Sequence, residues 1–167
     1  MQLPVADRAS KPLPDSMFRL VVFDIGDQRY ALRLPIVEQV LRMVEVSYLP
    51  EAPAIVLGVI NFHGRIIPVV DIQRRLGRSP IPYGLTSRLL VARTNRRTLA
   101  LPVDEVLGVQ DIPPENVTSP DAVFPGTGLV AGIVALSDGI LFIHDLDTFL
   151  SLDEERQLTE ALKEKSE

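Results

Sequence analysis

Side chains able to carry out acid–base, nucleophilic or metal chemistry are scarce in this sequence. It contains no cysteine, and its two histidines are His63 and His144. Disulfide scaffolds, thiolate metal sites and cysteine nucleophiles are therefore excluded. Neither histidine lies beside acidic residues at the spacing of a metal site. We therefore expect neither a bound metal ion nor a cofactor.

The sequence motifs that position catalytic groups are also missing. The chain has no phosphate-binding loop of the G-x-x-x-x-G-K type, no H-E-x-x-H helix and no G-x-S-x-G nucleophile turn. The glycine-rich stretch at 126–132 lacks the spacing of a dinucleotide-binding loop. Asp71 and Asp145 each follow an apolar strand and precede a short helical segment, a position where a carboxylate commonly caps a helix. These observations predict that the protein is not an enzyme.

One alternative from another functional class stays open at this level. The cleft between two halves of a double β-barrel could bind a small molecule or act on it. The best candidate residues for such a site would be His144, Asp145 and Asp147. Their closeness in sequence is read more simply as the end of a strand.

The composition favours a folded chain that binds proteins rather than nucleic acids. Of 167 residues, 46% are apolar and 23% are charged, and the net charge is −5. This negative balance disfavours nucleic acid as a partner, because phosphate binding requires a surplus of Lys and Arg. All three lysines lie near the chain ends, so the cations of the body are arginines, which are enriched at protein interfaces. Codon bias would give the same pattern.

No segment of the sequence is expected to enter a membrane. The longest uncharged run, at 122–137, is shorter than a membrane span and is interrupted by proline and glycine. The first residues contain no apolar core of a signal peptide. We therefore expect a soluble, cytoplasmic protein.

The apolar residues occur in short runs rich in Val, Ile and Leu, separated by turn residues, which is typical of β-strands. Gly26 and Asp27 predict a tight hairpin turn, and Pro35 is suited to begin a brief helical turn. His63 and Gly64 form the predicted tip of a second hairpin. The elements predicted for the first half are strands at 18–25, 29–34, 41–48, 55–62 and 65–72 and a helical turn at 35–40.

The second half of the chain repeats this order of elements. The run at 88–91 matches the run at 19–22, and Gly132 and Asp145 correspond to Gly58 and Asp71. Each half is too small for a wide sandwich, but a small barrel would remove its own exposed sheet edges. The sequence therefore predicts a mostly β fold, with two small five-stranded β-barrels side by side and a C-terminal helix.

These patterns define the expected organisation of the chain. We predict a disordered tail at 1–17, a single β domain at 18–150, and a C-terminal helix with its tail at 151–167. The barrel halves would span about 18–76 and 86–150, with a linker at 77–85. Ser151 and Glu154 have the spacing of a helix-capping box. Leu158 and Leu162 would form an apolar stripe that packs on the barrels or on a partner.

The segment at 55–72 is a nearly continuous apolar hairpin with a polar tip. Pro68 cannot donate a hydrogen bond to a neighbouring strand, so we expect its strand at a sheet edge or at a bulge. An apolar edge strand would invite a protein partner, whereas a buried strand with one bulge explains the same residues.

Residues 58–72, G-V-I-N-F-H-G-R-I-I-P-V-V-D-I, resemble the signature of CheW, the coupling protein of bacterial chemosensory arrays, and of the regulatory domain of the kinase CheA. Four further features agree with this family: G-D-x-x-Y at 26–30, the turn at 37–40, V-D-E-V-L-G-V at 103–109 and the terminal helix. The resemblance therefore covers about residues 18–165. It implies two five-stranded barrels that bridge the cytoplasmic tips of methyl-accepting chemoreceptors and a CheA-type histidine kinase. Such an adaptor would lie in the cytoplasm and reach membrane-bound receptor arrays through its partners.

The resemblance also implies a partner-binding surface, and the chain departs from the family there. The expected surface residues are Val37, Glu38, Gln39, Val40, Asn61, Phe62, His63 and Gly64. Gln39 stands where the family has an acid, and His63 stands where it has an arginine. Because losing only one charge would leave its partner unpaired, the two changes suggest altered partner selectivity, in a pathway other than flagellar swimming. The alternative is that His63 is simply a solvated turn residue.

Overall fold

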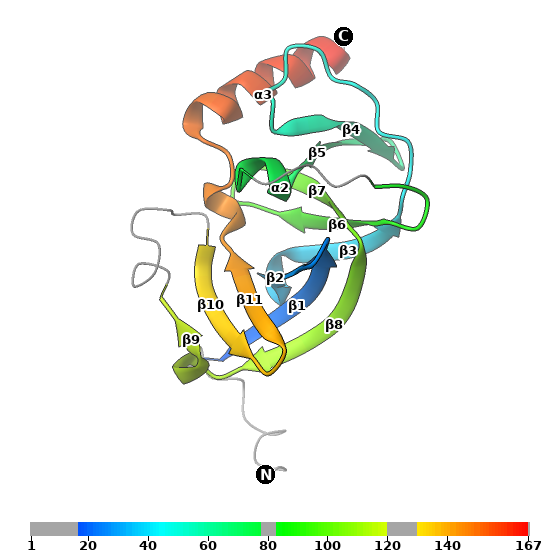
Figure 1. Cartoon of the computed structure of the whole chain (residues 1–167). Helices are drawn as coiled ribbons and strands as arrows, with labels where there is room; N and C mark the ends of the chain where they lie inside the picture. The colour runs from blue at the N-terminus through cyan, green and yellow to red at the C-terminus, as the bar shows by residue number, and fades with distance from the viewer. Residues whose placement is uncertain (1–16, 78–82, 120–129, 167) are drawn as a thin grey trace.

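The computed structural model describes residues 17–77, 83–119 and 130–166 and is mostly β, as predicted. The predicted tail, apart from Met17, and most of the predicted linker lie outside these residues, as does the glycine-rich stretch up to residue 129. A six-stranded and a five-stranded sheet make up the body, and α3 lies at the end formed by the five-stranded sheet (Figure 1).

The six-stranded sheet has the strand order β8-β1-β2-β11-β10-β9. Its strands are β1 (Phe18–Ile25), β2 (Gln28–Arg33), β8 (Glu105–Ile112), β9 (Val117–Thr118), β10 (Val130–Leu136) and β11 (Gly139–His144). The short 3-10 helix η2 (Pro114–Asn116) joins β8 to β9. Since β8 and β9 are consecutive in the chain yet lie at opposite ends of the strand order, the sheet curls round on itself.

The five-stranded sheet has the order β3-β6-β7-β5-β4. Its strands are β3 (Val37–Arg42), β4 (Val56–Phe62), β5 (Arg65–Val70), β6 (Arg88–Arg93) and β7 (Thr98–Val103). Beyond β3, Ser47 exchanges two backbone hydrogen bonds of 2.8 Å each with Val59 of β4. The chain that leaves one edge strand thus bonds to the other, which closes the sheet as a small barrel needs.

The sheets do not follow the two halves of the sequence, and here the expectation that each half closes its own barrel is wrong. The first hairpin, β1–β2, pairs with β8 and β11 from the second half. The hairpin β6–β7 of the second half pairs in turn with β3 and β5 from the first half. The two leading hairpins have almost the same apolar pattern, so sequence pattern alone does not determine which barrel each one completes.

Three apolar clusters show why this exchange is stable. One cluster fills each barrel. The third, which is the largest, lies between the two sheets, and we call it the shared cluster. Strands β1 and β6 contribute to two clusters each, so both of their faces are buried, which explains their continuous apolar sequences. On these two strands, the side chains that lie inside the barrels are Leu20 and Val22 of β1 and Leu89 and Val91 of β6. The side chains that enter the shared cluster are Val21, Phe23, Leu90 and Ala92.

Pro68 does not lie on an edge strand. Strand β5 lies between β7 and β4, and Pro68 is buried opposite Val59. The bulge is in the partner strand, between Val56 and Gly58. A proline is tolerated there because β5 and β7 pair over a single residue pair, Val69 and Ala100.

The predicted helix caps are confirmed. Asp71 accepts a hydrogen bond of 2.8 Å from the Gln73 amide at the start of α2 (Ile72–Arg75). Asp145 accepts one of 3.1 Å from the Asp147 amide at the 3-10 helix η4 (Leu146–Thr148). Both aspartates therefore serve local structure.

Helix α3 (Leu152–Ser166) begins with the predicted capping box and packs on the body of the protein. The Ser151 amide donates to Glu154 Oε1 at 2.9 Å, and the Glu154 amide donates to Ser151 Oγ at 3.1 Å. Leu158 is fully buried in the shared cluster, and Leu162 packs against it. Within the described residues, no helix is long and apolar enough to cross a membrane.

Candidate functional site

The expected partner-binding residues at 37–40 form the start of a strand rather than a helical turn. The 3-10 helix η1 covers Leu34–Ile36, and Val37 already has extended backbone angles and pairs with Ala92 of β6. The register then shifts between Val37 and Gln39, so Glu38 occupies a β-bulge. A bulge redirects a side chain, and here it coincides with the acidic residue of the segment.

The residues at 61–64 form the tip of the β4–β5 hairpin. His63 and Gly64 both have positive φ, of 53° and 87°, which suits the two-residue turn of a tight hairpin. The Gly64 amide donates a hydrogen bond of 2.9 Å to Asn61 Oδ1. The exposed His63 ring contacts Phe62 edge to face, with 4.3 Å between the ring centroids.

Glu38 is the centre of a polar cluster at one end of the five-stranded barrel. Arg65 Nη1 donates to Glu38 Oε1 at 3.4 Å, and the Thr98 hydroxyl donates to Glu38 Oε2 at 3.4 Å. Arg65 Nη2 also donates to Thr98 Oγ1 at 3.2 Å, and Arg93 Nε lies 4.0 Å from Glu38 Oε2. We call these four residues the Glu38 cluster. It contains two arginines for one acid and therefore carries a net positive charge.

The Glu38 cluster brings the two expected segments to the same end of the barrel. Arg65 directly follows the hairpin tip, and its contact with Glu38 links that tip to the start of β3. The side chain that contacts an arginine is that of Glu38, however, and not that of Gln39. Gln39 is exposed opposite Val91, and His63 points its ring toward Phe62.

Exposed apolar side chains lie on two of the strands that supply this charged cluster. Val40, which is 42% exposed, pairs with the buried Leu90 of the shared cluster. Ile66, which is 43% exposed, follows Arg65 in β5. Surfaces that combine charged and exposed apolar side chains are typical of protein contacts.

Arg65, Arg93 and Thr98 are the site residues that sequence reasoning missed. They lie in β5, β6 and β7, far from Glu38 in the sequence, and only the barrel brings them together. The one local signal is the position of Arg65, immediately after the tip at 63–64.

The residues of the rival catalytic site have other partners. Asp145 caps η4, and Asp147 accepts a hydrogen bond of 2.8 Å from the Asn95 amide. His144 is 3% exposed, and its ring lies 5.0 Å from that of Tyr30. Among the described residues, no group of three or more His, Cys, Asp or Glu is placed to hold a metal ion.

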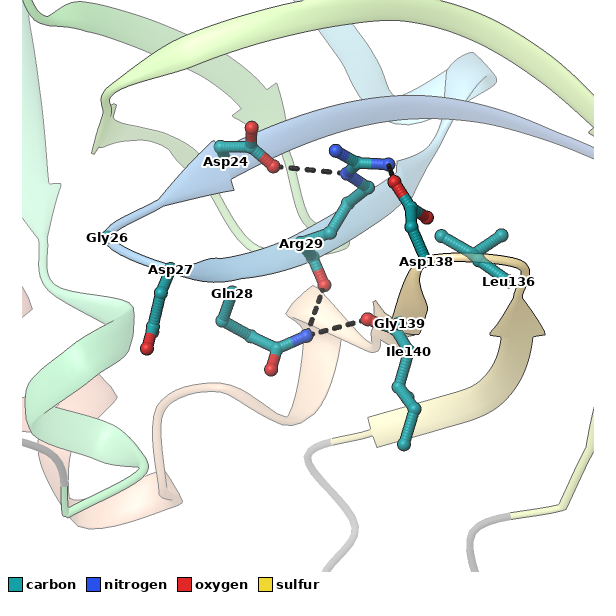
Figure 2. Close-up of a pocket in the computed structure, with 9 residues that line it drawn as sticks. All are labelled: Asp24, Gly26, Asp27, Gln28, Arg29, Leu136, Asp138, Gly139 and Ile140. Carbon is teal, nitrogen blue, oxygen red and sulfur yellow. Dashed lines mark hydrogen bonds and ion pairs between the residues drawn. The ribbon is translucent and has the colours of Figure 1, made fainter.

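A cleft of about 240 Å³ lies between the tips of the β1–β2 and β10–β11 hairpins (Figure 2). Three of its charged residues pair with one another, since Arg29 Nε lies 3.2 Å from Asp24 Oδ1 and Arg29 Nη1 lies 3.7 Å from Asp138 Oδ2. Gln28 Nε2 donates to the Ile140 carbonyl at 2.7 Å and joins the two hairpins. These contacts describe a structural junction between hairpins.

Comparison with known proteins gives one consistent result. The profile of the CheW-like domain matches residues 19–154. The chain is 34% identical to the chemotaxis protein CheW of Thermotoga maritima, over 84% of this chain and 93% of the relative. It is 27% identical to the chemotaxis protein CheW of Rhizobium meliloti, over 87% and 96%. The crystal structure of the scaffolding protein TtCheW from Thermoanaerobacter tengcongensis superposes with a TM-score of 0.73, at 28% identity, over 82% of this chain and 94% of that one.

Proposed function

The chain belongs to the CheW-like domain family, and we propose that it is a non-catalytic adaptor that couples chemoreceptors to a CheA-type histidine kinase. The observation that carries this proposal is the extent of the match, because the domain profile covers nearly all of the described body and the fold agrees with that of a CheW scaffolding protein. An adaptor needs binding surfaces and no reactive groups, which agrees with the structural roles of Asp71, Asp145 and Asp147.

We propose further that one partner binds at the end of the five-stranded barrel that carries the Glu38 cluster. Surface ion pairs such as Glu38–Arg65 contribute only about 0–1 kcal/mol to stability. Charges at an interface instead favour the correct partner and disfavour wrong ones. The exposed Val40 and Ile66, on the same two strands, would add apolar contact area. The surface thus comprises the segments 37–40 and 61–64, with Arg65, Arg93 and Thr98.

A binding experiment tests the adaptor role and this surface together. Immobilised protein is incubated with the cytoplasmic fragment of a chemoreceptor and, separately, with the regulatory domain of a CheA-type kinase from the same host. The adaptor proposal predicts that the wild type retains both, and it fails if the wild type retains neither. The double variant Glu38→Gln, Arg65→Gln should lose one of the two partners. The matched control is Arg19→Gln, Asp111→Asn, which removes an ion pair of 2.9 Å from the other sheet and should retain both.

Partner selectivity is a separate proposal. Gln39 and His63 replace the acid and the arginine of the family, while an acid–arginine pair is found at Glu38 and Arg65. The pair thus lies one residue before Gln39 and two residues after His63, so its charges would face a partner differently. We propose that this difference favours another receptor, in a pathway other than flagellar swimming. The double variant Gln39→Glu, His63→Arg should therefore change which of the host's chemoreceptors are retained. Unchanged binding to every receptor and kinase of the host would refute the selectivity proposal and leave the adaptor proposal standing.

A further inference from the structure

The tip of the β6–β7 hairpin is held from three directions. Thr94 Oγ1 accepts hydrogen bonds from the Arg96 and Arg97 amides, at 3.1 and 3.0 Å, which fixes the turn internally. The Asn95 amide donates to Asp147 Oδ1 at 2.8 Å, which fixes the turn to η4. The third attachment is the side chain of Arg97, which reaches α3.

Arg97 forms the best-buried ion pair described in the structure. Its Nε lies 2.7 Å from Glu155 Oε1, with side-chain exposures of 16% and 8%. Its Nη2 also donates to Thr159 Oγ1 at 2.7 Å, one turn further along α3. Two contacts from one planar guanidinium to successive turns of a helix fix both the distance and the orientation between the helix and the hairpin.

The residue that follows Arg97 belongs to the Glu38 cluster. Thr98 is the first residue of β7, and its hydroxyl donates to Glu38 and accepts from Arg65, at 3.4 and 3.2 Å. Arg93 pairs with Thr98 across the same hairpin and also approaches Glu38. The Arg97 side chain thus fixes the base from which Thr98 and Arg93 reach the candidate partner surface.

We propose that α3 is a positioning element for this surface: by holding Arg97, Glu155 and Thr159 set the place of Thr98 between Glu38 and Arg65. This inference rests on the proposed function of the Glu38 cluster as a partner-binding surface. The helix therefore contributes to partner binding without touching the partner. Arg97, Glu155 and Thr159 are positioning residues in this account.

The chain offers a matched control for this coupling. Glu154, which precedes Glu155, contacts Arg75 of α2 at 2.5 Å. The variant Arg75→Gln removes this second attachment of the same turn of α3, and the described side-chain contacts of Arg75, with Glu154 and Phe149, involve no residue of the Glu38 cluster. Comparing it with the double variant Glu155→Gln, Thr159→Val separates a loosened helix from a displaced hairpin. Thr159→Val alone keeps the ion pair, so it provides a milder variant if the double variant fails to fold.

The first measurement needs no partner. In ¹H–¹⁵N NMR spectra of the full chain, we expect the Arg65 Nε–H and Glu38 amide signals to shift in Glu155→Gln, Thr159→Val and in Thr159→Val alone. In Arg75→Gln these two signals should stay in place. Unchanged Arg65 and Glu38 signals in the α3 variants, alongside shifted α3 signals, would overturn the inference even if the protein is an adaptor.

The second measurement is a double-mutant cycle on binding to the chemoreceptor fragment or kinase domain that the wild type retains. We expect the α3 variant and Thr98→Val each to weaken binding about fivefold, and Arg75→Gln to leave it unchanged. Because both substitutions act through Thr98, the combined variant should bind only slightly more weakly than either one alone. Independent effects would instead multiply to a loss of affinity of roughly 25-fold. Additive losses would contradict the coupling. If the wild type binds neither partner, the proposed function fails, while the NMR result still decides the inference.

Discussion

Two single residues show most clearly how the five-stranded barrel is built. Glu38 occupies a bulge at the start of β3 and meets side chains from three other strands. Gly58, at the bulge of β4, lets the chain beyond β3 come close enough to close the barrel. A Cβ atom at Gly58 would lie 2.3 Å from the Ser47 carbonyl oxygen, and the glycine has a φ of +156°. One residue provides charge and the other provides space.

At this scale we predict that Gly58→Ala destabilises the protein by at least about 2 kcal/mol, because it adds both a backbone clash and conformational strain. Chemical denaturation followed by circular dichroism measures the free energy of unfolding. Gly84→Ala is the control, because Gly84 has open space around its Cβ position and no positive φ. Equal stability of the two variants would show that the close approach of Ser47 to β4 does not require a glycine at position 58.

At the scale of elements, ion pairs from Arg75 and Arg97 attach α3 to the body of the protein. Burial would raise the pKa of Glu154, but hydrogen bonds from Arg75 and Ser151, with the positive charge of Arg75, outweigh it and lower the pKa below its usual value. A carboxylate with a depressed pKa stabilises the folded state above its unfolded-state pKa, and this contribution disappears as the pH falls through the folded-state value.

The stability difference between the wild type and Glu154→Gln should therefore be largest near neutral pH and should shrink as the pH falls below about 4. Thermal unfolding of both proteins across this pH range measures the difference. Glu160→Gln on the same helix is the control, because the Glu160 side chain is 75% exposed and its described ion pair is with Lys163 of the same helix, at 3.5 Å. A difference that stays constant with pH would argue against an ionised Glu154 as the cause.

The elements also show which features the sequence can predict. The caps at Asp71 and Asp145 and the box at Ser151 and Glu154 join residues two or three positions apart, so local patterns are sufficient. Pro35 predicts a helical turn that runs to residue 40, whereas the observed turn covers Leu34–Ile36 and Val37 already begins β3. The contact of Glu38 with Thr98 spans 60 positions, and no local pattern predicts it.

At the scale of the whole molecule, the exchange of hairpins unites the two sheets. The repeat is visible in the sequence, and corresponding strands of the two halves pair in the same way: Val69 pairs with Ala100 in one sheet, as Ile143 pairs with Ala31 in the other. The repeat could not reveal that each leading hairpin completes the other barrel, because both hairpins are apolar on both faces. The largest apolar cluster then lies between the sheets.

We therefore predict that fragments 18–77 and 83–167 do not fold separately. Each would lack the hairpin that completes its barrel and would expose half of the shared cluster. Circular dichroism and NMR of the separate fragments should show no cooperative unfolding, whereas the mixed fragments should recover it. Independent folding of either fragment would contradict the exchange of β1–β2 and β6–β7.

An adaptor of this kind bridges two proteins, and a sedimentation assay measures that bridging. Membranes carrying a chemoreceptor of the host are mixed with its CheA-type kinase and increasing amounts of this protein, and the kinase that sediments with the membranes is measured. If the protein bridges receptor and kinase, sedimented kinase rises with added protein to saturation. The double variant Glu38→Gln, Arg65→Gln should reduce it, whereas Arg19→Gln, Asp111→Asn should not. Kinase sedimentation that is independent of the added protein would contradict the adaptor role.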